Sequence, residues 1–192
     1  MKMLLNLSLL LFMGTAFAQS IPSKEVQIKS AVLAAPEMYR DHATVIGYDT
    51  QGQFTTLRQG NNGMVCLADD PHQKGISISC YSDKLEPFMK RGRELTAEGK
   101  STAEKRAIRK KEIEQGTLPL PKEPAATYVL SAKDSDFDPQ TGNLKNSSLR
   151  YVFYKPYMTV EETGLPDKPQ GPGMPWLMDA GTHRSHIMIT PQ

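Results

Sequence analysis

The side chains best suited to metal chemistry are concentrated near the C-terminal end of the sequence. Asp179, His183 and His186 are of the types that ligate zinc, and three methionines in the same stretch carry soft sulfur atoms that suit copper. One hypothesis is therefore a copper or zinc site formed by Asp179, His183 and His186. The competing interpretation places Met188 in a terminal strand that packs into a core. The sequence favours it, because Gly181 interrupts any rigid helix that would present both histidines together, and no cofactor is then expected.

A second candidate for cation binding is the Asp134-x-Asp136-x-Asp138 pattern, which matches the opening spacing of a calcium-binding loop. The match ends there, since the sixth position is Pro139 and not glycine, and the twelfth is Lys145 and not a bidentate glutamate. Short polar residues of this kind are also typical of turns, because their side chains hydrogen-bond the local backbone. The sequence favours a polar turn between two strands.

The chain contains two cysteines, Cys66 and Cys80. Both lie in β-prone segments, and the alternation of each segment places the two thiols on the face that also carries apolar residues. Thirteen residues separate them, unlike the close spacing of redox-active or metal-binding cysteine pairs. We therefore expect a structural Cys66–Cys80 disulfide formed in an oxidising compartment, which leaves no cysteine nucleophile.

Residues 1–18 have the composition of a secretory signal peptide. A single lysine precedes an apolar stretch, and Ala16-Phe17-Ala18 is a small-x-small cleavage site. The apolar stretch is too short for a spanning helix, and no later segment approaches one. We predict that the chain is exported to the periplasm or secreted, that no transmembrane segment remains after cleavage, and that residues 19–192 form a single globular domain.

The charge of the chain is nearly balanced, with 23 basic and 21 acidic residues and a formal net charge of +2. Such a balance gives no global attraction to nucleic acid or an anionic membrane, so nucleic acid is not an expected partner. Basic side chains do gather between Lys105 and Lys111. That stretch is either a patch for an acidic partner or, as the sequence favours, a solvated helix with internal ion pairs.

The order of short β-prone segments and turns predicts an antiparallel sheet. Four such segments follow one another within residues 43–81, and Asp49–Gly52 and Gly60–Gly63 separate the first three. The second turn contains Asn-Gly, the strongest local hairpin signal, because both residues accept the positive φ of a type I′ turn. We predict that residues 43–81 form a meander, which later strands extend to about six in all.

Residues 83–115 change from the period of a strand to that of a helix. Four apolar residues fall on one face of a first helix: Leu85, Phe88, Met89 and Leu95. Ser101-x-x-Glu104 is then a capping box that opens a second helix. Together these patterns predict an α+β fold, in which a helical hairpin at about 83–115 packs on or beside the antiparallel sheet.

Part of the sequence resembles a family of small exported bacterial proteins. The signature of that family is an LR-x-G-x-NG-x-x-C segment, a short loop with aspartate and proline, a second cysteine and a C-terminal His-x-Met strand. The matching positions are Leu57, Arg58, Gly60, Asn62, Gly63, Cys66, Asp69, Pro71, Cys80, His186 and Met188. The resemblance implies export and a sheet of this kind, and it brings no activity. It marks Arg58, Asn62 and His186 as residues to test.

The sequence lacks the common catalytic and nucleotide-binding motifs G-x-S-x-G, H-E-x-x-H, the P-loop and G-x-G-x-x-G after a strand. Three classes of function remain, in this order. The first is an exported, non-enzymatic binding or envelope-associated module, because no group of candidate residues requires chemistry. The second is a periplasmic copper- or zinc-handling protein. The third is a hydrolase of unfamiliar type, since a triad is defined by geometry and not by sequence order.

Overall fold

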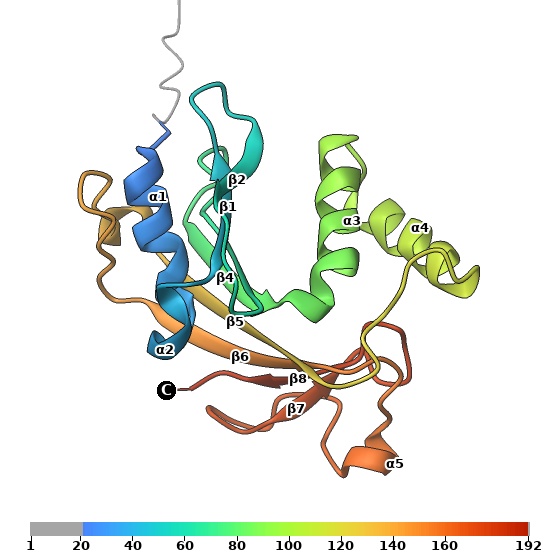
Figure 1. Ribbon diagram of the computed structural model, residues 1–192. Coiled ribbons are helices and arrows are strands. Elements are labelled where there is room, and N and C mark those ends of the chain that lie inside the picture. The colour runs from blue at the N-terminus through green and yellow to red at the C-terminus, as the bar shows by residue number, and fades with distance from the viewer. Residues whose placement is uncertain (1–20, 192) are drawn as a thin grey trace, which may run out of the picture.

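The computed structural model describes residues 21–191 of the 192-residue chain (Figure 1). The predicted signal peptide, residues 1–18, lies outside this range. The described residues form one eight-stranded sheet in the order β2-β1-β3-β4-β5-β6-β8-β7. The strands are β1 (Thr44–Tyr48), β2 (Phe54–Arg58), β3 (Met64–Leu67), β4 (Ile76–Ser82), β5 (Ala125–Ala132), β6 (Ser148–Tyr154), β7 (Trp176–Met178) and β8 (His186–Ile189). The helices are α1 (Lys24–Ala31), α2 (Glu37–Arg40), α3 (Glu86–Ala97), α4 (Thr102–Glu114) and α5 (Val160–Thr163), with short 3-10 turns η1 (Val32–Ala34), η2 (Asp83–Leu85) and η3 (Asp134–Asp136).

The structure confirms the predicted α+β class, but the sheet has eight strands where about six were predicted, and the pairing within residues 43–81 differs from the predicted meander. β1 and β2 form the expected antiparallel hairpin, but β3 does not pair with β2. It crosses back and runs parallel to β1, with Val45 opposite Cys66. Every other neighbouring pair in the sheet is antiparallel.

The close approach of Gly60 to another stretch of backbone explains the parallel pairing of β3 with β1. A Cβ atom at Gly60 would lie 2.3 Å from main-chain atoms of residues 42–44, so only glycine allows the chain to pass there. Asn61 N donates to His42 O at 3.0 Å, and Asn62 Nδ2 donates to Tyr39 O at 2.7 Å. These bonds tie the predicted turn to the start of β1 and to α2. Only Gly63 of the Asn-Gly pair has a positive φ, of 75°, so no type I′ turn forms.

The predicted disulfide is present and joins two neighbouring strands. Cys66 on β3 lies directly opposite Cys80 on β4, and the two sulfur atoms are bonded. Both residues are fully buried. Cys80 lies on the same face of β4 as Ile76 and Ile78, as the alternation of the sequence predicts, and Cys66 lies on the same side of the sheet.

One face of the β1–β4 half of the sheet is covered by the N-terminal segment. α1, η1 and α2 pack against it (Figure 1). Alanine and valine side chains of residues 31–35, with Tyr39 of α2 beside them, join the disulfide and the strand residues in one buried cluster. Gln27 on α1 is buried and bonds both backbone groups of Tyr48: its Nε2 donates to Tyr48 O and its Oε1 accepts from Tyr48 N, each at 2.8 Å. Burial of this side chain therefore leaves neither its donor nor its acceptor unpaired.

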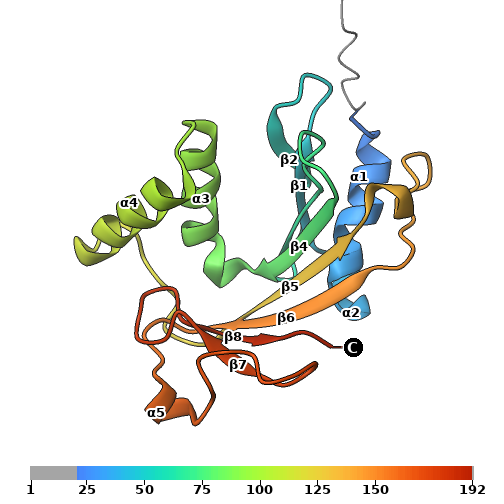
Figure 2. The ribbon, with the colours of Figure 1, turned by 180° about the vertical axis from the view of Figure 1, so that it is seen from behind.

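The helical hairpin lies on the opposite side of the sheet from α1, as both views show (Figures 1 and 2). The predicted helical face is buried at Leu85, Phe88 and Leu95 and half-buried at Met89. The predicted capping box is present at the start of α4, where Ser101 Oγ accepts from Glu104 N and the Glu104 carboxylate accepts from Ser101 N. No helix among residues 21–191 combines the length and the apolar character that a bilayer crossing needs.

Candidate functional site

A large hollow among the described residues is a groove between the β1–β4 half of the sheet and the helical hairpin. Its volume is about 1010 Å³. One wall is formed by β1, β2, β3 and β4, and the other by α3 with two side chains from α4. In Figure 1 these walls are the upright strands at the centre and the green helix α3 facing them. We call this hollow the sheet–helix groove.

The sheet wall of the groove combines apolar and small polar side chains. Ile46 and Leu67 form apolar surface on β1 and β3, while Ser77 and Ser79 lie on β4. The two serines face away from the disulfide because alternate residues of a strand point to opposite sides of the sheet. This mixture of apolar floor and scattered hydrogen-bonding groups is typical of sites that bind organic or peptide ligands.

A buried hydrogen-bond network fixes the helix wall against the sheet. Tyr81 is fully buried on β4, and its hydroxyl donates to Glu86 Oε2 at 2.6 Å. Arg93 Nη1 donates to the same hydroxyl at 2.7 Å, and its Nη2 pairs with Glu86 Oε1 at 2.5 Å. Burial, and next the hydrogen bond to Glu86, raise the pKa of Tyr81. The guanidinium also lies 5.8 Å from the ring centroid of Phe54, so Arg93 extends toward β2.

The helix wall of the groove carries more basic than acidic side chains. Lys90 and Lys105 line the helix wall, while Asp69 and Asp70 lie at the end of the groove beyond β3. Within residues 21–191, neither lysine forms an ion pair, and the Lys105 ammonium instead donates to Thr96 Oγ1 at 3.0 Å. Arg93 and Arg109 also line the helix wall, together with Glu86 and Glu94, so this wall has a net positive charge.

Asp69 is the most perturbed carboxyl group of the groove. Burial raises its pKa to about 6, the backbone hydrogen bond from Ser77 opposes the rise, and the negative charge of Asp70 adds to it. Its Oδ1 accepts from Ser77 N at 2.7 Å, and Asp70 Oδ1 accepts from His72 N at 3.0 Å. Both carboxylates therefore hold the loop between β3 and β4 in shape.

Arg109 on α4 is one of the side chains that line the groove. Among the described residues it forms no ion pair with a carboxylate. Its Cζ lies 4.1 Å from the ring centroid of Phe88, a cation–π contact, and Nη1 donates to Phe88 O at 3.4 Å. Burial, and next the positive charge of Arg184, lower the pKa of Arg109. This contact joins α4 to α3, where Gly92 leaves room for the guanidinium.

The residues predicted for a metal site do not come together as one. Asp179 pairs with Arg184 at 2.8 Å, and His186 Nδ1 lies 2.7 Å from Arg184 O. His183 is buried beside Phe88, with ring centroids 6.3 Å apart, and its Nε2 has no partner within residues 21–191. Burial, followed by the positive charge of Arg184, lowers the pKa of His183. Across the described range, no three His, Cys, Asp or Glu side chains are grouped so as to hold a metal ion.

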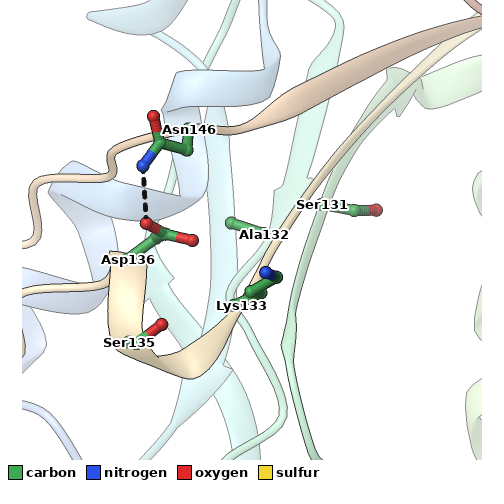
Figure 3. A pocket seen from close by; sticks show the side chains of 6 residues that line it. All are labelled: Ser131, Ala132, Lys133, Ser135, Asp136 and Asn146. Atoms are coloured by element: carbon green, nitrogen blue, oxygen red, sulfur yellow. Dashed lines mark hydrogen bonds between the residues drawn. The ribbon is translucent and has the colours of Figure 1, made fainter.

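The Asp134-x-Asp136-x-Asp138 pattern forms the polar turn that the sequence favours. Asp134 accepts from Gly75 N, Asp136 accepts from Asn146 Nδ2 at 2.9 Å, and Asp138 accepts from Gln140 N and Thr141 within its own turn. The three carboxylates thus point to three different partners. Figure 3 shows Asp136 and Asn146 bonded at the rim of a second hollow of about 520 Å³, whose lining also includes Lys133 and Ser135.

Arg58 and Asn62, marked by the family resemblance, bond to the backbone outside the groove. Arg58 Nε donates to Ala43 O at 3.0 Å and its Nη2 to Arg40 O. Asn62 donates to Tyr39 O and accepts from Met64 N at 3.1 Å. Both side chains hold the crossing between α2, β1 and β3. His186 lies on β8 opposite Tyr154, so the three residues do not form one cluster.

The sequence reasoning identified only part of the groove: Lys105 lies in the predicted basic stretch and Met89 on the predicted helical face, whereas the strand residues and most of α3 were not selected. Ser77 and Ser79 alternate with the buried residues of β4, and Lys90, Arg93 and Ala97 occupy one face of α3 at helical spacing. Tyr81 does not line the groove but anchors its helix wall through Glu86 and Arg93. The clearest available signal is Tyr81, an aromatic residue on the polar face of β4. No family model, curated protein or solved structure shows significant similarity to this chain, so the family resemblance stays a prediction.

Proposed function

We propose that this protein is an exported, non-enzymatic binding module whose ligand lies in the sheet–helix groove. The observation that carries the proposal is the groove itself: about 1010 Å³ of hollow with an apolar floor, polar strand residues and a basic helix wall. Its shape is held by the Tyr81–Glu86–Arg93 network and by the Asp69 and Asp70 carboxylates, so it exists before a ligand binds. A preformed site loses little ordering free energy on binding.

Export is part of the proposal and has two supports. The first is the signal-peptide pattern of residues 1–18, and the second is the Cys66–Cys80 disulfide, a bond typical of oxidising compartments. The non-enzymatic part is supported by the use of the groove's carboxylates as loop acceptors and of Arg93 as a partner of Glu86. Asp69, Asp70 and Arg93 therefore have structural roles in the folded protein.

The test maps the binding of a fragment library by NMR. Methyl signals of Ile46, Leu67 and Met89 report on the groove, and those of Leu149 and Ile189 report on the far half of the sheet. We expect fragments to shift the first set selectively. Ser79→Trp fills the groove and should abolish these shifts, whereas Ser148→Trp, on an exposed residue of β6, should leave them unchanged. Fragments that ignore the groove, or that bind equally to both variants, contradict the proposal.

A further inference from the structure

β2 is an edge strand whose outer side is open. It pairs only with β1, and no strand lies beyond it in the sheet order of the described residues. Phe54, Thr55 and Thr56 are exposed. The stretch from Phe54 to Leu57 contains no lysine, proline or acidic residue, three of the devices by which proteins protect sheet edges from pairing. The β1–β2 ladder has a bulge between Val45 and Ile46, beyond Thr56, and its register is regular from Phe54 to Thr56.

The register of β1 and β2 shows which backbone groups point outward. Asp49 N donates to Gln53 O at 3.0 Å, so Asp49 and Gln53 form a hydrogen-bonded pair. Hydrogen-bonded and non-hydrogen-bonded pairs alternate along an antiparallel ladder. Tyr48 with Phe54 and Ile46 with Thr56 are therefore non-hydrogen-bonded pairs, and the pair at Thr55 between them is hydrogen-bonded. Ile46 confirms this pattern, since its carbonyl accepts from Ala68 N on the far side of β1.

The N–H and C=O groups of Phe54 and Thr56 therefore face away from β1. Within residues 21–191 none of these four groups has another hydrogen-bond partner. They form two donor–acceptor pairs two residues apart, which is the spacing that an added β-strand matches.

The free edge borders the sheet–helix groove. Phe54 and Thr56 contribute to the groove lining, and Lys90 and Lys105 face it from the helix wall. A strand added to β2 would place alternate side chains on the same face of the sheet as those of Phe54 and Thr56. An acidic side chain there would meet a basic wall whose two lysines have no carboxylate partner in the described part of the chain.

We propose that the ligand of the groove is an extended peptide segment of another protein, which adds to β2 as a further strand and carries acidic side chains toward Lys90 and Lys105. This inference rests on the proposed function and names the class of ligand. A second copy of this chain fits the edge less well, because its own β2 would bring Arg58 and no acidic residue to the basic wall.

The first test uses linear random-sequence peptides displayed on phage and selected against the purified mature chain, residues 19–192, in its oxidised form. Selected peptides should be enriched in Asp and Glu at alternate positions. In synthetic copies, N-methylation at alternate residues should weaken binding about 10-fold per lost hydrogen bond, while methylation at the residues between them should not. Amide exchange on the unmodified protein should slow at Phe54 and Thr56 when a peptide binds.

The second test uses matched variants. Thr56→Pro removes an outward N–H without removing a bond to β1, a position where an edge strand tolerates proline, and it should weaken peptide binding about 10-fold or more. Thr56→Val keeps the N–H and should bind normally. Lys90→Gln with Lys105→Gln should weaken acidic peptides and reduce the salt dependence of binding, whereas Lys145→Gln, on an exposed residue far along the chain, should not.

Each contrary outcome has a distinct meaning. Peptides whose binding Ser79→Trp abolishes, but which neither protect Phe54 and Thr56 nor respond to alternate N-methylation, overturn strand addition and leave the groove as the site. Selection that yields no binding peptide overturns the peptide assignment, and the fragment experiment then decides the groove separately. Concentration-dependent dimers that protect Phe54 and Thr56 without peptide identify a second copy as the occupant and refute the proposal.

Discussion

The contact between Arg109 and Phe88 permits a direct measurement of how the two helices of the hairpin are held together. Phe88 is buried between α3 and β6, with its ring centroid 5.6 Å from that of Tyr154. Phe88→Ala should therefore lower the free energy of unfolding by about 3–5 kcal/mol, the range for removing a buried phenylalanine. Phe88→Leu preserves most of the apolar volume and should cost roughly 1.5 kcal/mol or less from packing alone.

The cation–π part of this contact is separated by a double-mutant cycle. Arg109→Met keeps an apolar stem and removes the charge that lies 4.1 Å from the ring centroid. Because the guanidinium is partly desolvated and has no ion-pair partner within residues 21–191, we expect a coupling free energy of about 1 kcal/mol between Phe88→Leu and Arg109→Met. Arg109→Lys keeps the charge and should retain part of that coupling.

The assay is urea denaturation of the four proteins of the cycle, followed by far-UV circular dichroism under oxidising conditions. A coupling within about 0.3 kcal/mol of zero would show that Phe88 and Arg109 act through packing alone, and it would refute the cation–π argument. Equal m-values across the four proteins are the control, because they show that the denatured states are comparable.

Three further predictions concern single residues or bonds. The purified protein should have a mass two hydrogens below that of the reduced chain, with Cys66 and Cys80 in one linked peptide. The double variant Cys66→Ser with Cys80→Ser should lower the free energy of unfolding by about 3 kcal/mol in the chain-entropy model. Thiols that alkylate in the native protein would contradict the presence of the disulfide. Asp69 has a raised pKa of about 6, so its protonation stabilises the fold: this contribution is fully present below about pH 4 and is lost as the pH rises through 6. Asp69→Asn keeps an acceptor for Ser77 N and should be more stable than the parent at pH 7.5 by about 1 kcal/mol after allowance for solvent screening. The gain should be absent at pH 4, and the control variant Asp167→Asn should show none at either pH. A gain in stability that does not depend on pH would count against the argument. Gln27→Ala leaves the backbone groups of Tyr48 unpaired beneath α1 and should lower the free energy of unfolding by about 1–3 kcal/mol, measured by thermal or urea denaturation. Gln59→Ala, at an exposed position, should change this free energy very little. Equal losses of stability in the two variants would show that Gln27 has no special role.

The parts of the fold that could be predicted from the sequence are those that local chemistry determines. The alternation in residues 76–81 identified the buried face of β4, and with it the pairing of Cys66 with Cys80. Ser101 and Glu104 form their capping box through contacts three residues apart. In each case the interacting groups are close in the sequence or follow from the period of a single strand.

The parallel pairing of β1 with β3 depends on a contact that no local pattern contains. Gly60 fits against the backbone of residues 42–44, and Asn62 bonds Tyr39, which is 23 residues away. An Asn-Gly pair followed by a β-prone run looks the same in a hairpin and in this crossing. The groove was equally hidden, because Tyr81, Glu86 and Arg93 meet only after the chain turns from β4 into α3.

The position of the disulfide imposes an order of events during maturation. Cys80 Sγ lies 3.2 Å from the carbonyl oxygen of Ala31. Both cysteines are fully buried, and the N-terminal segment from α1 to η1 covers them. An oxidant reaches the thiols only while that segment is undocked. Residues 24–35 therefore dock onto the sheet after the disulfide has formed, and they cover that bond in the folded protein.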